Sequence, residues 1–168
     1  MQRVPLVVVD AANVFGSVPD GWWRDRRAAA TRLRDTLADL ATEGLRSAGV
    51  PEWVREAPLE VVLVVEGAAR GITETATVRV LDAPGSGDDA IVDLVTLEGA
   101  NRHCLVVTAD RALRTRVESI GAEVRGPRTV RTPAAAPASS RGSARDRGKS
   151  SRPGRGEDAD RIDEAESP

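Results

Sequence analysis

The amino-acid sequence predicts an α/β fold in which a mostly parallel sheet carries helices on both faces. Short apolar runs alternate along the chain with longer segments whose apolar residues recur every three or four positions. The runs are apolar at successive positions, which is typical of strands that are buried on both faces of a parallel sheet. Aromatic residues make up only 2% of the chain, so the expected core is built from aliphatic side chains.

These patterns place each strand and helix along the chain. The first strand is a run of β-branched residues that ends at Asp10. The strands are expected at residues 4–9, 59–65, 77–81, 104–108 and 122–124. The helices are expected at residues 22–47, 88–99 and 110–120. Gly49 and Pro51 are expected to end the first helix.

The composition limits the classes of protein and of chemistry. No apolar run approaches the roughly 18 residues of a membrane helix, and the apolar stretch near the N-terminus is shorter than the signal-peptide core of about 7–15 residues. We therefore expect a cytoplasmic protein without a membrane partner. Cys104 and His103 are the only cysteine and histidine. This excludes an intramolecular disulfide, a cysteine-based zinc cluster, and Ser-His-Asp or Cys-His catalysis within the chain.

The distribution of charge divides the chain into a domain and a tail. Residues 1–125 carry 15 basic and 19 acidic side chains, whereas residues 126–155 carry 8 basic and 1 acidic. From Thr132 onward Ile162 is the one large aliphatic residue, so this segment cannot offset the entropy lost on ordering. We expect a folded domain at 1–127 and a disordered tail at 128–168. The tail either holds a nucleic-acid backbone through its arginines or serves only for solubility.

Acidic residues follow each of the first four predicted strands where the strand ends. Because ligands of parallel sheets bind outside the carboxyl ends of the strands, we expect these side chains at one edge of the sheet. They are Asp10, Glu66, Asp82 with the following pair Asp88 and Asp89, and Asp110. Carboxylates that lie close together repel one another unless they take up protons or bind a cation. Oxygen ligands alone suit Mg²⁺ or Mn²⁺, which can activate a water for attack on a phosphodiester.

Each of these residues also has a structural interpretation. The alternatives are helix N-caps for Asp88, Asp89 and Asp110, and solvent exposure for Glu66 and Asp93. Asp10 ends a strand that is expected to be central, where an unpaired charge is costly, so its alternative is a pair with an arginine. Trp22 and Trp23 either pack at the start of a helix or offer a base-stacking surface beside the site.

Three segments carry a more specific signal. The first is VVVDAANVFG at residues 7–16, a strand that runs into Asp-x-x-Asn. The second is GSGDDAIVDLV at 85–95, with an acidic pair at a predicted helix start. The third is VVTADRALRTRV at 106–117, a strand followed by Thr-x-Asp. In their order and spacing these segments resemble NYN domains of the PIN-like nuclease superfamily, over roughly residues 4–125.

The resemblance implies a three-layer αβα sandwich and a Mg²⁺- or Mn²⁺-dependent ribonuclease whose partner is RNA. The catalytic and metal-binding residues that it implies are Asp10, Asn13, one or both of Asp88 and Asp89, and Asp110, with Glu66 and Asp93 as further ligand candidates. Asn13 would orient the cluster or the scissile phosphate, and Thr108 would brace Asp110 or a metal-bound water. Arg111 and Arg114 would contact phosphates. The sequence leaves open the oligomeric state and any need for a ribosome or another protein partner.

Two other functions stay open on the sequence alone. One is a nucleotide phosphohydrolase that uses the same carboxylates, and the other is a non-catalytic RNA-binding module that grips through the tail. Other doubly wound families fit less well. No Gly-x-Gly-x-x-Gly follows the first strand, which disfavours a dinucleotide-binding fold. Haloacid-dehalogenase-like phosphatases would show Asp-x-Asp, but Ala12 stands at the second acidic position.

Overall fold

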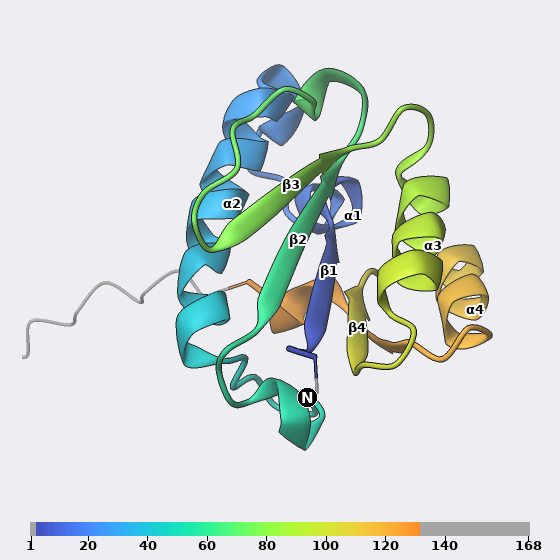
Figure 1. The fold of residues 1–168 in the computed structure, drawn as a ribbon. Coiled ribbons are helices and arrows are strands. Elements are labelled where there is room, and N and C mark those ends of the chain that lie inside the picture. Colours follow the sequence, from blue (N-terminus) through green and yellow to red (C-terminus); the bar gives the residue numbers. More distant parts are fainter. Residues whose placement is uncertain (1–2, 132–168) are drawn as a thin grey trace, which may run out of the picture. The chain divides into compact units, whose positions relative to one another are not determined.

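The computed structural model describes residues 3–131, and within them five strands form one parallel sheet (Figure 1). The strands are β1 (Leu6–Asp10), β2 (Glu60–Val65), β3 (Val78–Asp82), β4 (Cys104–Val107) and β5 (Glu123–Arg125). Their order across the sheet is β3-β2-β1-β4-β5, so β1 lies at the centre, between β2 and β4. The predicted α/β class with a parallel sheet is confirmed.

The helices cover both faces of the sheet and give three layers. They are α1 (Ala11–Gly16), α2 (Arg26–Glu43), α3 (Gly87–Glu98) and α4 (Arg111–Glu118). Buried side chains of α1 and α2 form one core with one face of the sheet, and those of α3 and α4 form a second core with the other face (Figure 1). The αβα sandwich that the resemblance implied is therefore present in this structure.

The side chains of β1 alternate between the two cores. Val7 and Val9 pack in the core of α1 and α2, whereas Leu6 and Val8 pack in the core of α3 and α4. Every residue of β1 is buried, as expected for a central strand. Because the period of a strand is two residues, the last residue, Asp10, belongs to the same face as Leu6 and Val8. The strand thus directs its one carboxylate toward the α3 side.

Helix α2 is shorter than the predicted helix over 22–47. It begins after Asp25, whose carboxylate accepts a hydrogen bond from the Ala28 N–H at 2.9 Å. It ends at Gly44, which has a φ of 84°. A Cβ there would collide with the backbone carbonyl of Arg55, so a residue with a side chain does not fit this turn. Gly44 therefore ends the helix before Gly49 is reached.

The folded part extends past the predicted boundary at residue 127. A short turn spans Pro127–Thr129, and Val130 is buried in the core of α1 and α2. The Ser47 hydroxyl donates a hydrogen bond to the Thr129 carbonyl at 2.6 Å. Residues 128–131, which the prediction assigned to the tail, thus belong to the domain, because the Val130 side chain packs in its core. One valine does not stand out in a segment that is otherwise polar and rich in proline. The rest of the predicted tail, residues 132–168, lies outside the described residues.

No helix in residues 3–131 combines the length and the apolar character needed to cross a membrane.

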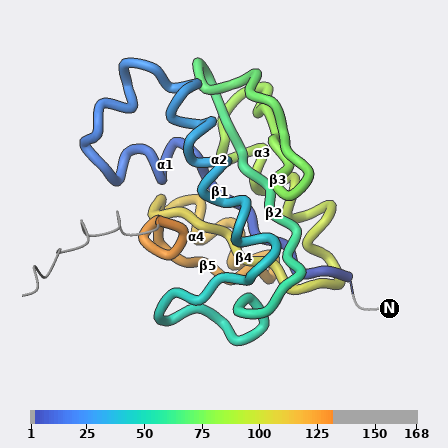
Figure 2. The backbone as a smooth tube through the Cα atoms, turned by 90° about the vertical axis from the view of Figure 1, so that its left-hand side faces the viewer, coloured from blue at the N-terminus to red at the C-terminus, as the bar shows by residue number. Residues whose placement is uncertain are grey.

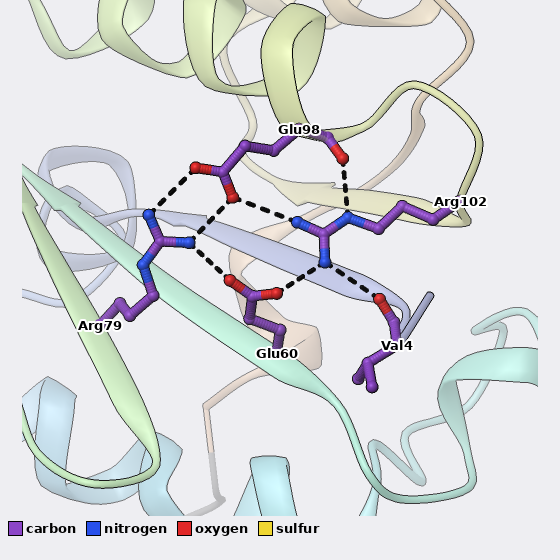
Figure 3. Close-up of polar contacts among 5 residues, drawn as sticks. All are labelled: Val4, Glu60, Arg79, Glu98 and Arg102. Atoms are coloured by element: carbon purple, nitrogen blue, oxygen red, sulfur yellow. Dashed lines mark hydrogen bonds and ion pairs between the residues drawn. The ribbon is translucent and has the colours of Figure 1, made fainter. Parts of the chain in front are cut away.

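An ion-pair network joins the amino ends of the strands (Figure 3). Asp10 stands at the carboxyl end of β1, so the network lies on the opposite edge of the sheet. Arg102, just before β4, donates to Glu60 at 2.6 Å, to Glu98 at 3.2 Å and to the Val4 carbonyl at 3.1 Å. Arg79 of β3 also bonds both carboxylates, with 2.8 Å to Glu98. Only 6% of the Arg102 side chain is exposed, so its charge is held almost entirely by these partners.

Candidate active site

Four predicted carboxylates lie together at the carboxyl edge of the sheet. Asp10 ends β1, and Glu66 follows β2 on the same face, since Val62 and Val64 pack in the core of α3 and α4. Asp88 stands in the first turn of α3, and Asp110 directly precedes α4. Their charges interact: Asp88 and Glu66 raise the pKa of Asp10, and Asp110 and Glu66 raise that of Asp88.

Asp10 is the buried member of this cluster, with 6% of its surface exposed. Burial is the largest effect on its carboxyl group and raises the pKa to about 6, from an ordinary value of 3.8. Hydrogen bonds from the Thr108 hydroxyl and the Asn13 N–H lower the pKa in part. Among the described residues no arginine forms an ion pair with Asp10, so within residues 3–131 the arginine pairing considered from the sequence is absent.

The Asp-x-x-Asn and Thr-x-Asp segments are joined directly by hydrogen bonds. The fully buried Thr108 donates from its hydroxyl to Asp10 Oδ2 at 3.0 Å, and the Thr108 hydroxyl oxygen accepts the Asp110 N–H at 3.1 Å. Asn13 Oδ1 accepts the Ala109 N–H at 2.7 Å. Thr108 and Asp10 meet because they end neighbouring strands on the same face. The two motifs therefore form one connected unit across β1 and β4.

Asp110 combines a structural and an electrostatic role. Its Oδ1 accepts the Leu113 N–H at 2.8 Å and caps α4, as the N-cap interpretation predicted. Its charge also raises the pKa of Asp88, so the cap faces the carboxylate cluster. One side chain can fill both roles because the N-cap of α4 comes just after β4, at the edge of the sheet where the other carboxylates lie.

The acidic pair at the start of α3 is divided between two environments. Asp88 is half-buried, and burial followed by the charges of Asp110 and Glu66 raises its pKa. Asp89 is exposed, and its Oδ1 accepts a hydrogen bond from Arg116 at 2.8 Å, which lowers its pKa. Neither residue is the N-cap of α3, because Ser86 Oγ accepts the Asp89 N–H at 3.2 Å. The pair thus contributes Asp88 to the cluster.

Glu66 is docked on the start of α3 instead of facing solvent in a loop. Its Oε2 accepts the Gly87 N–H at 2.5 Å. A Cβ at position 87 would lie 3.0 Å from the same oxygen, so the glycine makes room for the carboxylate. The Gly-Asp-Asp sequence therefore brings both Glu66 and Asp88 to the edge of the sheet.

Two other acidic residues lie away from the cluster. Asp82 of β3 points to the opposite face, since Leu81 packs with the α3 core, and it accepts the Gly71 N–H at 3.1 Å. The carboxylate that joins the cluster after β3 is therefore Asp88, at the start of α3, and not Asp82 at the end of the strand. Asp93 is exposed one turn along α3. Within residues 3–131 it makes no hydrogen bond or ion pair.

The predicted phosphate-contacting residues, Arg111 and Arg114, are exposed in the first part of α4. They follow Asp110 directly along the chain, and neither forms an ion pair with another described residue. Their guanidinium groups are thus unoccupied by protein partners in that part of the chain, next to the carboxylates.

The donors at this edge match the chemistry of a hard divalent cation. They are all oxygens, and the mutual repulsion of Asp10, Glu66 and Asp88 is of the kind that a cation relieves. Over residues 3–131 no three aspartate, glutamate, histidine or cysteine side chains gather closely enough to enclose an ion. Mg²⁺ usually keeps several waters and takes only one or two carboxylates, so an open set of this kind fits a hydrated ion.

Replacing Thr108 by valine is expected to lower the free energy of unfolding by roughly 1–3 kcal/mol, because it removes two buried hydrogen bonds at nearly constant volume. It is also expected to raise the pKa of Asp10 further. Urea denaturation and NMR titration of the Asp10 carboxyl measure both effects. Thr115→Val on the exposed side of α4 is the matched control. Equal stability of the Thr108 variant and the wild type would contradict the role given to this hydroxyl.

Comparison with known proteins adds evidence on the fold. No family model and no curated protein matches the sequence. Solved structures do match, among them a crystal structure of a single-residue variant of Rae1 (YacP) from Bacillus subtilis. The match covers 76% of this chain and 72% of the Rae1 chain, with a TM-score of 0.55 and 17% sequence identity.

The chain is similar in fold to Rae1. At 17% identity, the likeness to Rae1 shows a shared architecture, which agrees with the α/β sandwich described above.

Proposed function

We propose that this protein is a metal-dependent ribonuclease of the NYN type, which uses Mg²⁺ or Mn²⁺ to hydrolyse phosphodiester bonds of RNA. The observation that carries the proposal is the connected unit of Asp10, Asn13, Thr108 and Asp110, with Asp88 beside it. The resemblance of these segments to NYN domains and the fold shared with Rae1 support it. RNA is accordingly the proposed partner.

In this proposal Asp10, Asp88 and Asp110 would hold the cation, in part through its bound waters, with Glu66 on its outer side. When bound, the ion supplies an activated water and stabilises the attacking and leaving oxygens of the phosphodiester. Thr108 and Asn13 donate hydrogen bonds that favour the ionised form of the buried Asp10 carboxylate.

Other side chains orient the cluster and the substrate. Asn13 Oδ1 fixes the loop between Thr108 and Asp110 through the Ala109 N–H. A phosphate chain approaching these carboxylates meets like charge, so it requires cationic side chains nearby. Arg111 and Arg114, exposed beside Asp110, supply that positive charge in the proposal.

Asp88 and Asp89 provide a sharp test, because the two adjacent carboxylates face different surroundings. Mixed-structure RNA is incubated with the protein and Mn²⁺, Mg²⁺ or EDTA. Cleavage is expected only with a metal ion, and Asp88→Asn is expected to reduce it by more than about 100-fold, since even outer-shell partners of metal sites contribute 10- to 100-fold. Asp89→Asn is expected to keep activity within a few-fold of wild type. Asp39→Asn on the exposed side of α2 is the charge-matched control.

The other outcomes separate the alternatives. Intact RNA in every lane, with folded protein, would contradict the ribonuclease. Binding of RNA that survives Asp10→Asn without turnover would favour the binding module, and hydrolysis of free nucleotides would favour the phosphohydrolase. Cleavage that none of the variants changes would indicate a contaminant.

A further inference from the structure

Trp23 presents a large aromatic surface to solvent near the carboxyl edge of the sheet. It is 53% exposed, although its neighbour Trp22 is half-buried. Both lie in a short 3-10 turn, Trp22–Arg24, which precedes α2. The exposed indole ring is apolar surface in contact with water. A ligand that covered this surface would gain free energy by removing it from water.

The Trp23 ring is held by packing beneath it. Its ring meets Trp22 edge-on, with centroids 6.2 Å apart and an angle of 85° between the planes. Trp22 in turn stacks on the buried Phe15 of α1, with centroids 6.0 Å apart. The helix-start packing predicted from the sequence therefore applies to Trp22. Trp23 is the member of the pair whose ring remains available.

Arg24, Arg26 and Arg27 lie close to Trp23 in the chain, and no described carboxylate forms an ion pair with them. Arg24 and Arg26 form no ion pair within residues 3–131, and the Arg26 guanidinium lies over the Trp22 ring at 5.4 Å. Arg27 donates from Nε to the Arg70 carbonyl at 3.1 Å, which anchors it. Asp25 lies between Arg24 and Arg26 in the chain, and its Oδ1 accepts the Ala28 N–H at the N-cap of α2. The patch is locally basic although residues 1–125 are acidic overall.

The ring and the arginines line a hollow at the same end of the domain as the carboxylate cluster. The hollow has a volume of about 610 Å³ and is lined by Trp23, Arg24, Asp25, Arg26, Arg27 and Ala68. Ala68 belongs to the turn that begins directly after Glu66, and this turn packs against α2. Both views of the chain show the start of α2 and the end of β2 at the same end of the domain (Figures 1 and 2).

We infer that Trp23, with Arg24 and Arg26, binds single-stranded RNA by stacking an unpaired base on the indole and pairing the guanidinium groups with flanking phosphates. A flat aromatic surface among arginines is the arrangement that recognises unpaired nucleotides, since paired bases do not expose a face. The inference rests on the proposed function and adds where the substrate is held. It makes an unpaired base, and not only the backbone, a recognised element.

The test measures binding in EDTA, so that its result does not depend on cleavage. A labelled single-stranded RNA of about 10 nucleotides is titrated with the full chain by fluorescence anisotropy, beside a duplex of the same sequence. Trp23→Ala is expected to weaken binding of the single strand by roughly 10-fold or more, and Trp23→Phe to restore most of it. Arg24→Gln with Arg26→Gln is expected to weaken binding and to flatten its dependence on salt.

Arg46→Gln, an exposed arginine beyond the other end of α2, is the matched control and is expected to bind as the wild type does. Wild-type affinity in a folded Trp23→Ala variant would overturn the inference, as would equal affinity for the duplex or absence of RNA binding. Loss of single-strand binding in Trp23→Ala would uphold it even if the wild type cleaved no RNA, an outcome that would count against the proposed activity alone.

Discussion

An Asp10→Asn variant is expected to unfold at a higher temperature than the wild type in EDTA at pH 8, while it loses cleavage in the presence of metal. The reason is that the folded protein buries an ionised carboxylate at the end of β1, beside the charges of Asp88 and Glu66. Asparagine keeps the shape of the side chain and one accepting oxygen but carries no charge. Stability and function thus make opposite demands on this position.

The sign of the pH dependence follows from the pKa of Asp10, which is raised in the folded state to about 6 from an ordinary value of 3.8. The folded protein retains this proton to higher pH than the unfolded chain. The ionised carboxylate therefore begins to destabilise the folded state as the pH rises from 3.8 to about 6. Below this interval the carboxyl is protonated in both states and the destabilisation vanishes. A shift of this size corresponds to a stabilisation on the order of 2–3 kcal/mol for the variant at pH 8.

Thermal unfolding of both proteins, followed by circular dichroism at pH 8 and near pH 4 with EDTA present, measures this effect. The gain is expected at pH 8 and should shrink toward zero in acid. Asp39→Asn, which removes an exposed charge, controls for the change in net charge. A variant less stable than the wild type at pH 8, or equally stabilised at both pH values, would show that burial of Asp10 is not the cause.

Replacing Arg102 by methionine is expected to lower the free energy of unfolding by roughly 2–4 kcal/mol, because it removes the buried centre of the network at the amino edge of the sheet. The variant leaves Glu60 and Glu98 facing one another with Arg79 as their only described partner (Figure 3). The Val4 carbonyl also loses its donor. The estimate lies below that for a fully buried pair because both carboxylates are about a third exposed.

The destabilisation is expected to diminish in acid. For Glu60, burial raises the pKa, but hydrogen bonds from Arg102 and Arg79 outweigh it and the net pKa is lowered from 4.5. The hydrogen bond from Arg79 is the main cause that lowers the pKa of Glu98 from 4.5. Their stabilisation is therefore complete above the ordinary value and is lost as the pH falls through the lowered one.

Urea denaturation at pH 7 and below pH 4 measures this difference, with Arg46→Met as the control for loss of an exposed arginine. At temperatures where the Arg102 variant stays folded, its cleavage activity is expected to match the wild type, since the network lies on the edge opposite Asp10. A stability equal to that of the control variant would contradict the role given to the network.

Much of the sheet and of the cluster could be predicted because both depend on simple periods. Apolar runs mark the strands, and the ends of parallel strands meet at one edge, which brings together Asp10, Glu66 and Asp110. The same two-residue period, applied to β3, would have directed Asp82 to the other face. That step requires the exact register of a strand whose pattern is only partly apolar.

Other features depend on backbone geometry that composition does not reveal. Helix α1 has only 6 residues and follows β1 without a loop, so it shows no helical period. Gly44 ends α2 through a close approach to Arg55, a contact that exists only after folding. The separation of Asp88 from Asp89 depends on where α3 begins. Serine is a preferred N-cap residue, so Ser86 is the signal in the sequence that could have predicted the start of α3.

The hydrogen bond between Thr108 and Asp10 joins two residues that are 98 positions apart in the sequence. During synthesis Asp10 emerges from the ribosome long before Thr108 has been made. Until then β1 lacks its neighbour β4. The carboxylate cluster therefore cannot assemble before residues 108–110 have been made. An enzyme that cleaves RNA would in this way stay inert at least until that part of its own chain had left the ribosome.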